Sequence, residues 1–303
     1  MKLAILCPGQ GAQHSAMLEL VAGHPDAEDV LAEGAQAVGA HVRDWLAQPL
    51  LIHDNAIAQP LLCLIEFATW AALRGALPQP VSFAGYSVGE LASHACAGGI
   101  AAGELARLAQ RRAAFMDAAN PRPGGLLALR GLLRSDVEAL CAGRSAWIAI
   151  ANGNDAFVVG GDSTILDSLS AQAVARGGQV TCLKVGVASH TPWLAKAVRS
   201  FQQALDASTL HAPVIPVIAG VDASLVTSRA KAISALAAQL ATTIEWSRCL
   251  EALYERGCRV FLELGPGDQL SRMVRELLPS DVDARSVSNF RSLEGAAEWV
   301  TRH

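Results

Sequence analysis

A serine flanked by two glycines is the residue of this sequence whose surroundings best suit nucleophilic chemistry. Residues 85–90 read Gly-Tyr-Ser-Val-Gly-Glu, with Ser87 at the third position. The glycines allow a sharp backbone turn, and the N-terminus of a following helix favours developing negative charge. Because the motif also occurs by chance in glycine-rich chains, its surroundings decide the interpretation. An apolar run at 81–84 and a helical pattern at 91–96 predict a nucleophile elbow.

A serine nucleophile needs a base, and the sequence offers eight histidines. His190 lies between the end of a predicted strand at 184–187 and a helix start at Pro192. Proteins of the α/β class carry much of their chemistry at the ends of strands. His94 follows the serine by about two helical turns and is interpreted as structural. Position along the chain therefore favours His190 as the general base.

The composition is that of a folded protein without a nucleic-acid footprint. Of the 303 residues, 51% are hydrophobic and 17% charged, which is enough apolar material for a sizeable core. The net charge is −4, and the densest basic cluster, Arg107 with Arg111 and Arg112, is too small to bind a duplex. Seven scattered cysteines without a Cys-x-x-Cys pair predict neither a disulfide framework nor a metal site.

No targeting or membrane-spanning segment is expected. The apolar run near the N-terminus stops at Pro8 and Gly9, which is too short for a signal peptide. No stretch is expected to approach the ~20 apolar residues of a membrane span. With reduced cysteines, these features lead us to expect a soluble protein of the cytoplasm.

Two segments of different rhythm are predicted to position these residues. The first and last parts of the chain alternate strands and helices, with predicted strands at 3–7, 81–84, 214–219, 259–264 and 286–287, and predicted helices at 17–21, 60–70, 91–96, 101–117, 193–205, 230–241, 271–278 and 294–302. After a Pro/Gly-rich break at 120–125, the order becomes β-α-β-β-α-β, which suits a ferredoxin-like unit. Its predicted strands are 126–129, 146–150, 156–160 and 180–185, and its helices are 133–141, with Ser135 as N-cap, and 164–175.

The predicted fold is therefore α/β, with an α/β-hydrolase-like large domain built on a parallel sheet. Residues 1–123 and 188–303 are expected to form this domain, which would carry Ser87 and His190. Residues 124–187 are expected to form an inserted ferredoxin-like small domain.

Five motifs, in this order along the chain, resemble those of the malonyl-CoA:acyl-carrier-protein transacylases. They are Pro-Gly-Gln-Gly-Ala-Gln at 8–13, the elbow at 85–90, Arg112 ahead of Phe115 and Met116, Ser189-His190, and Glu-Leu-Gly-Pro-Gly at 263–267. Each motif alone is weak, but the ordered set spans residues 8–267, nearly the whole chain.

The resemblance implies roles for named residues. Ser87 would carry a malonyl group, with His190 as its base and the backbone N–H groups of Gln10 and Val88 as the oxyanion hole. In relatives a backbone carbonyl orients the histidine, and Gln239 occupies the matching place. No bound cofactor is implied. The donor would be malonyl-CoA and the acceptor the thiol arm of an acyl carrier protein.

The resemblance also implies that Arg112 binds the free malonyl carboxylate. A guanidinium pairs with a carboxylate in bidentate fashion, which would select malonyl over acetyl groups. Arg111 is the alternative, because neighbours on a helix point about 100° apart and only one can face a cleft. The distance to Phe115 and Met116 favours Arg112.

The sequence departs from the family around the expected acyl pocket. Tyr86 precedes the nucleophile where relatives usually carry histidine, and Cys7 stands where phenylalanine is frequent. Trp193 is bulkier than its usual counterpart and either lines the acyl pocket or packs beneath the helix. These changes bear on acyl selectivity rather than on the type of reaction.

Segments 84–90, 124–131 and 286–293 resemble more closely the epsilon subunit of malonate decarboxylase. That resemblance implies a transacylase that primes the carrier subunit of the decarboxylase. The alternatives are a housekeeping malonyl transacylase of fatty-acid synthesis, a serine thioesterase or esterase, and a non-catalytic scaffold. The intact pair of Ser87 and His190 argues against the scaffold.

Overall fold

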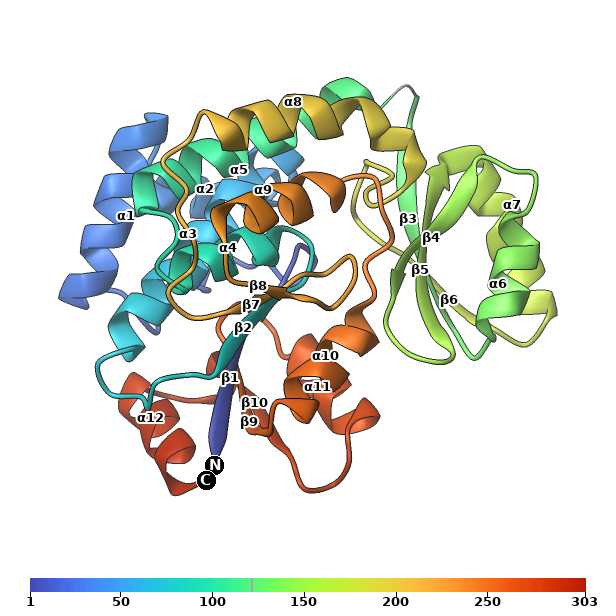
Figure 1. Ribbon diagram of the computed structural model, residues 1–303. Coiled ribbons are helices and arrows are strands. Elements are labelled where there is room, and N and C mark those ends of the chain that lie inside the picture. The colour runs from blue at the N-terminus through green and yellow to red at the C-terminus, as the bar shows by residue number, and fades with distance from the viewer. Residues whose placement is uncertain (121) are drawn as a thin grey trace.

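The computed structural model describes residues 1–120 and 122–303, so Pro121 of the predicted break lies outside the described residues. Two β-sheets organise the chain (Figure 1). One has six strands and lies between helices, and the other has four strands and stands beside it. The two termini lie side by side, and the N-terminal amine of Met1 donates to the carbonyl of His303 over 2.9 Å.

The six-stranded sheet has the order β10-β9-β1-β2-β7-β8. Its strands are β1 (Lys2–Cys7), β2 (Ser82–Gly85), β7 (Val217–Ile218), β8 (Leu225–Val226), β9 (Cys258–Glu263) and β10 (Asp283–Ser286). All neighbours pair in parallel except β7 and β8, which are antiparallel. The strand β1 is central and buried from Leu3 to Cys7, as expected for a parallel strand covered on both faces. The predicted parallel core is confirmed.

The alternation of side chains along β1 separates two apolar layers. Leu3 and Ile5 pack in a cluster with α3, α4, α5, α8, α9 and α12, whereas Ala4 and Leu6 pack in a second cluster with α10 and α11. The bounds of these helices are α3 (Asn55–Leu73), α4 (Val88–Cys96), α5 (Ala102–Ala119), α8 (Ala195–Asp206), α9 (Arg229–Ala238), α10 (Trp246–Glu255), α11 (Gln269–Leu277) and α12 (Leu293–Arg302). Two further helices near the N-terminus are α1 (Pro25–Val38) and α2 (Val42–Leu46). Three short 3₁₀ helices are η1 (Leu51–His53), η2 (Pro192–Leu194) and η3 (Val287–Asn289).

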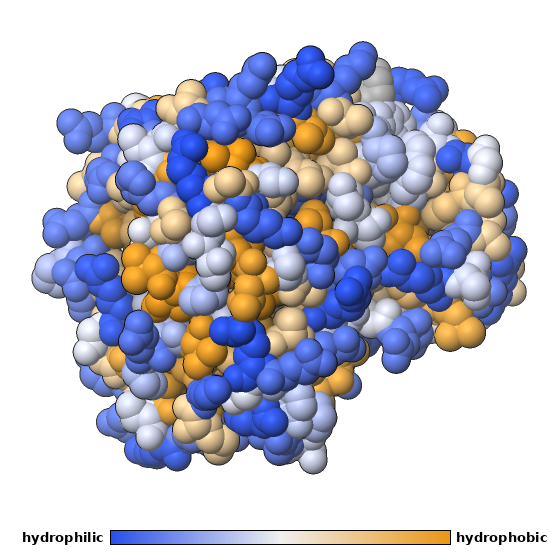
Figure 2. All heavy atoms as spheres, viewed as in Figure 1, coloured by the Kyte–Doolittle hydropathy of each residue, from blue (hydrophilic) through white to orange (hydrophobic). Residues whose placement is uncertain are grey.

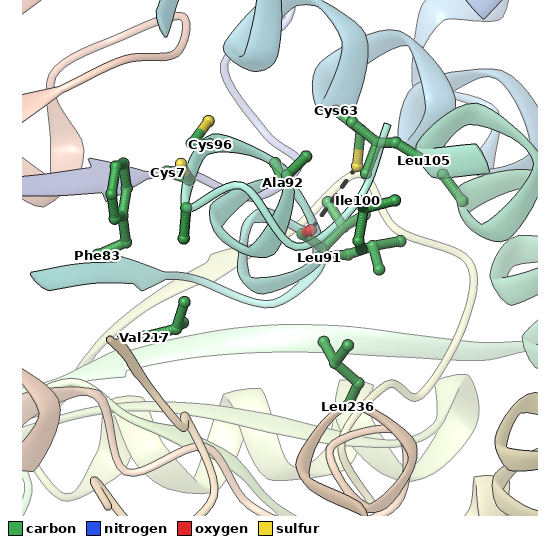
Figure 3. Close-up of a cluster of buried hydrophobic side chains, with 14 of the residues drawn as sticks. Cys7, Cys63, Phe83, Leu91, Ala92, Cys96, Ile100, Leu105, Val217 and Leu236 are labelled. Atoms are coloured by element: carbon green, nitrogen blue, oxygen red, sulfur yellow. Dashed lines mark hydrogen bonds between the residues drawn. The ribbon is translucent and has the colours of Figure 1, made fainter. Parts of the chain in front are cut away.

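The apolar cluster that contains Leu3 and Ile5 fixes the position of α4 (Figure 3). Leu91 and Ala92 of α4 are fully buried among side chains of the sheet and of α3 and α5. The thiol of Cys63 on α3 donates to the carbonyl of Val88, with Sγ 3.8 Å from the oxygen. The first turn of α4, which follows Ser87, is therefore anchored from outside the elbow.

The four-stranded sheet is antiparallel, with the order β4-β5-β3-β6. Its elements are β3 (Gly124–Arg130), α6 (Arg134–Cys141), β4 (Ala146–Ala151), β5 (Ala156–Asp162), α7 (Ser163–Ala175) and β6 (Gln179–Cys182). This confirms the predicted β-α-β-β-α-β succession. The two helices and the sheet bury an apolar cluster of their own that includes Leu127, Val137 and Phe157. The exact domain bounds at 123/124 and 187/188 stay a prediction.

Some predicted elements were wrong. Residues 15–23 form successive turns rather than a helix, and the extended segment 214–219 contributes only the two residues of β7. Ser135 does not cap α6, because the N-cap is Leu133. The strand predicted at 180–185 belongs to the small sheet as expected but ends at Cys182. The strand end predicted at 184–187 is absent, so His190 does not directly follow a strand. The sequence patterns did not reveal α1, α2, α10 or β8.

The expectation that no segment approaches a membrane span needs correction at α3. By length and composition, this 19-residue helix is apolar enough to cross a membrane, the one such helix in the described part of the chain. The helix is a core element of the fold, since 78% of its most apolar window is buried. On the face shown in Figure 2, hydrophobic side chains gather in patches separated by hydrophilic ones.

Candidate active site

Ser87 lies in a strained turn between β2 and α4. Its backbone has φ 57° and ψ −120°, in the region that favours glycine, which is the geometry of a nucleophile elbow. The flanking glycines allow the turn to close. A Cβ on Gly85 would lie 2.1 Å from the backbone nitrogen of Glu90, and a Cβ on Gly89 would lie 2.1 Å from the carbonyl oxygen of Cys7. Any side chain at these two positions would displace backbone.

His190 contacts Ser87, although the two residues are far apart in the sequence. Its Nε2 lies 2.7 Å from the Ser87 Oγ, and its Nδ1 lies 2.6 Å from the carbonyl oxygen of Gln239. A carbonyl can only accept, so Nδ1 carries the proton and Nε2 is free to accept from the serine hydroxyl. Burial, and then the charge of Arg112, lower the pKa of His190 to about 3, although the bond to Gln239 opposes this shift. The imidazole is therefore neutral and able to act as a base at neutral pH.

The loop that carries His190 is also strained. The residue has φ 62°, and its backbone N–H donates to the carbonyl of Leu240 over 2.9 Å. His190 is thus held at its backbone and at its ring by the adjacent carbonyls of Leu240 and Gln239. By contrast His94, interpreted as structural, is completely buried within α4.

The amides expected to form an oxyanion hole lie beside the elbow. Val88 is the first residue of α4, and Gln10 lines the same cavity as Ser87. Within the part of the chain that the structure describes, neither backbone N–H donates to a protein acceptor. Both donors are therefore free to bind an oxygen that develops charge near Ser87.

Arg112 is buried, with only 1% of its surface exposed. Its Nη1 donates to the Oε1 of Gln59 and its Nη2 to the Oε1 of Gln239, both over 2.8 Å. Burial lowers the pKa of Arg112 to about 10, so the guanidinium stays charged at neutral pH. Arg111 is exposed and lies over the ring of Phe115. Of the two candidates, Arg112 is the one that faces the interior.

Gln239 forms hydrogen bonds to four other residues of this site. Its backbone carbonyl accepts from His190, and its side-chain oxygen accepts from Arg112. Its side-chain nitrogen donates to the carbonyl of Ser87 over 3.1 Å and to Oε2 of Glu90 over 2.6 Å. Sequence reasoning assigned only the carbonyl of Gln239 and did not identify Gln59 or Glu90 as parts of the site. Glu90 closes the elbow motif, which was the available signal.

A cavity of about 430 Å³ opens at Ser87 between the two sheets. The large-sheet side contributes Gln10, Tyr86, Ser87 and His190, and the small sheet contributes Leu126, Ile150 and Val158. Tyr86 lines this cavity as expected, and its ring packs edge-on against Trp246 at 5.3 Å between centroids. The cavity is large enough for an acyl group and part of a thioester arm.

Of the two places considered for Trp193, the acyl pocket needs correction and packing is the one observed. Among the described residues, those that line the cavity at Ser87 do not include Trp193. Its ring packs edge-on against Trp147 of β4 at 6.2 Å, and the guanidinium of Arg122 lies 5.7 Å from the centre of the ring. Trp193 therefore packs against the small sheet, next to the helix start at η2.

The described residues hold no group of three or more His, Cys, Asp or Glu side chains that could bind a metal ion. The chemistry available at the site is nucleophilic and acid–base. A serine hydroxyl faces a neutral imidazole, two backbone amides beside the elbow have no acceptor among the described residues, and a buried cation is connected to Ser87 through the Gln239 amide. This arrangement suits acyl transfer from a thioester with a carboxylate at its far end.

Several known proteins are similar to this chain over nearly its whole length. The model of the acyl transferase domain family matches residues 5–294. The malonyl CoA-acyl carrier protein transacylase of Mycobacterium bovis is 32% identical over 306 residues, covering 97% of this chain and 99% of that protein. The crystal structure of malonyl-CoA:acyl carrier protein transacylase from Xanthomonas oryzae is 29% identical, with a TM-score of 0.92 and 99% of each chain covered. A structure of a type II PKS acyl-carrier protein in complex with its malonyl-transacylase is 26% identical, with a TM-score of 0.92, covering 98% of this chain and 99% of that one.

Proposed function

This chain belongs to the acyl transferase family, among the malonyl-CoA–acyl carrier protein transacylases, and from that premise we propose which of its residues move a malonyl group. Malonyl-CoA is the donor, Ser87 carries the malonyl group, and the thiol arm of an acyl carrier protein is the acceptor. The observation that carries this proposal is the 2.7 Å contact between Ser87 Oγ and a neutral His190, with Arg112 buried on the same network.

The first half of the reaction loads the enzyme. His190 Nε2 takes the hydroxyl proton as Ser87 Oγ attacks the thioester carbonyl of malonyl-CoA. The N–H groups of Gln10 and Val88 stabilise the negative oxygen of the tetrahedral intermediate. When the intermediate collapses, the C–S bond breaks and the imidazolium gives its proton to the CoA sulfur. Malonyl-Ser87 and free CoA thiol result.

The second half reverses these steps with a different thiol. His190 takes the proton of the carrier-protein thiol, and the sulfur attacks the ester carbonyl of malonyl-Ser87. The C–O bond to Ser87 breaks and the proton returns to Oγ. In both halves the carbonyl of Gln239 accepts from Nδ1, which keeps the imidazole in the required tautomer and stabilises its charged form.

Arg112 selects the acyl group. The buried guanidinium has the neutral amide oxygens of Gln59 and Gln239 as its direct partners and no carboxylate in contact within the described part of the chain, so a malonyl carboxylate can pair with it directly and an acetyl group cannot. This electrostatic difference is the physical basis of the proposed preference for malonyl thioesters.

The general, housekeeping role is the better supported setting. Malonyl CoA-acyl carrier protein transacylases are similar to this chain over 91–97% of its length, and one similar structure holds a carrier protein of the type II PKS class. Priming of malonate decarboxylase rests only on the likeness of segments 84–90, 124–131 and 286–293. We place the reaction in the cytoplasm, where acyl-CoA and carrier proteins meet.

Mass spectrometry of the intact protein tests the core of this proposal. After incubation with malonyl-CoA, one malonyl group is expected on the wild-type protein, located at Ser87 by peptide mapping, and none on Ser87→Ala. Absence of the adduct from the wild-type protein would refute the proposal.

The fate of the adduct separates the remaining alternatives. Addition of an acyl carrier protein with a phosphopantetheine arm is expected to clear the adduct faster than water does. Faster clearance by water would indicate a thioesterase. Faster clearance by a carrier with a dephospho-CoA-derived arm than by the ordinary carrier would restore the decarboxylase assignment.

A further inference from the structure

A buried carboxylic acid, Glu90, lies one amide group away from the malonyl-binding arginine. Glu90 is on the first turn of α4, and its side chain is completely buried. Its Oε2 accepts from the side-chain nitrogen of Gln239 over 2.6 Å and from the backbone N–H of Gly220 over 3.0 Å. Its Oε1 has no hydrogen-bond partner in the described part of the chain. Such a carboxyl needs a reason to be retained in the interior.

The Gln239 amide lies between two groups of opposite charge. Its oxygen faces the guanidinium of Arg112, and its nitrogen faces the carboxyl of Glu90. This is the orientation in which the amide dipole is favourable toward a cation on one side and an anion on the other. No described carboxylate lies within 4.0 Å of Arg112, so Glu90 provides its counter-charge through the amide. The same arrangement fixes the residue whose carbonyl orients His190.

We propose that Glu90 is a positioning residue that acts through Gln239, and that its negative charge is exchanged for that of the malonyl carboxylate when substrate binds. In the free enzyme, Glu90 balances Arg112 whenever its carboxyl group is ionised. When the malonyl carboxylate pairs with Arg112, two anions would share one buried cation, so Glu90 takes up a proton from solvent. Malonyl binding is then coupled to the uptake of one proton. This inference rests on the proposed function, because it assumes that Arg112 binds the malonyl group.

The groups around Glu90 allow its titration to be isolated. Burial raises the pKa of Glu90 to about 7, opposed by its hydrogen bonds to Gln239 and Gly220 and by Arg112. Asp222, in the turn after β7, has a lowered pKa, and Cys249 on α10 and Cys63 on α3 have pKa values raised by burial. His190 stays neutral and Arg112 stays charged near pH 7. In this group only Glu90 changes charge between pH 6 and about 8.5.

The sign of the effect follows from linkage. Below pH 7 Glu90 is already protonated, so malonyl binding needs no proton and KM for malonyl-CoA is constant. Above pH 7 each binding event takes up a proton, so KM rises with pH, with about tenfold per pH unit as the upper limit for one proton. The kcat changes less than KM, since the charge exchange belongs to binding.

Glu90→Gln provides the test because it keeps the shape and the acceptor oxygen but removes the charge. Between pH 6.5 and 8.5, KM for malonyl-CoA is expected to rise about threefold or more in the wild-type protein and less than about 1.5-fold in the variant. Glu251→Gln, an exposed position on α10, is the matched control and is expected to follow the wild type. An equal rise in the wild type and in Glu90→Gln, or no rise in either, would overturn the proposal.

A direct measurement keeps the inference testable if Glu90→Gln does not fold. In Ser87→Ala, which binds but cannot be acylated, calorimetry in two buffers of different ionisation enthalpy counts the protons taken up. Malonyl-CoA at pH 8 is expected to bind with uptake approaching one proton, and acetyl-CoA with none. No difference between the two ligands contradicts the charge exchange. If the wild-type protein forms malonyl-Ser87 normally, that result leaves the proposed function intact.

Discussion

At the scale of single residues, the site depends on which polar groups are left without a matching partner. The Ser87 hydroxyl faces an imidazole whose other nitrogen is already committed to the Gln239 carbonyl. The Arg112 guanidinium is buried against amide oxygens, which bind its N–H groups but do not cancel its charge. The Ser87 hydroxyl is therefore placed to attack a bound substrate with His190 as its base, and the Arg112 guanidinium is placed to bind an anion.

The paired arginines on α5 make a sharp selectivity test. Arg112→Ala is expected to lower kcat/KM for malonyl-CoA by about 10- to 100-fold, because a charge-assisted hydrogen-bonded contact is worth roughly 1.5–3 kcal/mol. Its kcat/KM for acetyl-CoA should change much less. Arg111→Ala, the matched control, removes an exposed neighbour and should leave both values within about twofold. Equal losses for the two substrates in Arg112→Ala would show that the arginine is structural.

The low pKa of His190 predicts an unusual pH dependence for the rate of Ser87 malonylation in mildly acidic solution. Because burial and Arg112 lower the pKa of His190 to about 3, the base stays neutral in mildly acidic solution. The single-turnover rate of Ser87 malonylation at saturating malonyl-CoA is therefore expected to be flat from pH 5 to about 6.5, where an ordinary histidine would lose activity. Rapid-quench measurements over this range check the prediction, and a rate that halves near pH 6.5 would contradict it.

At the scale of elements, α4 converts a strand end into a nucleophile site because it approaches β1 unusually closely. Gly89 on the first turn of α4 faces the carbonyl oxygens of Cys7 and Pro8, where a Cβ would lie at 2.1 and 2.4 Å. On its other side, α4 contacts the sulfur of Cys63 and the apolar cluster that contains Leu3 and Ile5. The elbow is thus fixed by close packing on both sides, which the glycines of its turn sequence make possible.

Gly89→Ala tests this closeness. The added methyl group would displace backbone on β1 or α4, so the free energy of unfolding is expected to fall by about 3 kcal/mol or more, with loss of malonylation. Gly75→Ala is the control, because a Cβ there meets nothing within 4 Å. Urea unfolding of both variants measures the difference. Equal stability of Gly89→Ala and Gly75→Ala would show that the packing can relax.

At the scale of the whole molecule, the site exists because two sheets meet at it. A segment of the large-sheet part, residues 243–245, runs beside β4, with Ile150 and Ile244 forming a parallel bridge. The hydroxyl of Thr243 donates to the carbonyl of Ile148 over 2.7 Å. This segment follows Gln239 closely in sequence, so the contact that seats the small sheet lies next to the residue that organises the active site.

Thr243→Val isolates the contribution of this junction. Loss of the bond to Ile148 leaves a carbonyl without its side-chain donor, so the free energy of unfolding is expected to fall by about 1 kcal/mol. The rate of Ser87 malonylation should stay within about twofold, because the backbone bridge remains. Thr242→Val, at the exposed neighbouring position, should change neither value. A large loss of rate in Thr243→Val with unchanged stability would mean that the junction acts on the site itself.

The sequence by itself determined the features whose signals are local. Apolar runs marked β1 and the buried α3, a change of rhythm marked the β-α-β-β-α-β insert, and the spacing of glycines around Ser87 marked the elbow. These patterns are readable because side-chain periodicity and backbone strain depend on neighbouring residues. The apolar residues at 15–23 suggested a helix where the chain forms turns, and the amphipathic helix α10 was not recognised, since tertiary packing decides the conformation of such short segments.

Only the tertiary structure decided how the distant polar groups pair. His190 was selected for a strand end that it does not follow, yet the fold brings it to 2.7 Å from the serine. The several contacts of Gln239 and the place of Glu90 depend on bonds between residues 49 to 152 positions apart. The structure also buries Arg112, which spacing in the sequence favoured, and exposes Arg111. Pairings of this kind leave no periodic trace in a single sequence, because burial and geometry, not adjacency, determine which polar groups are matched.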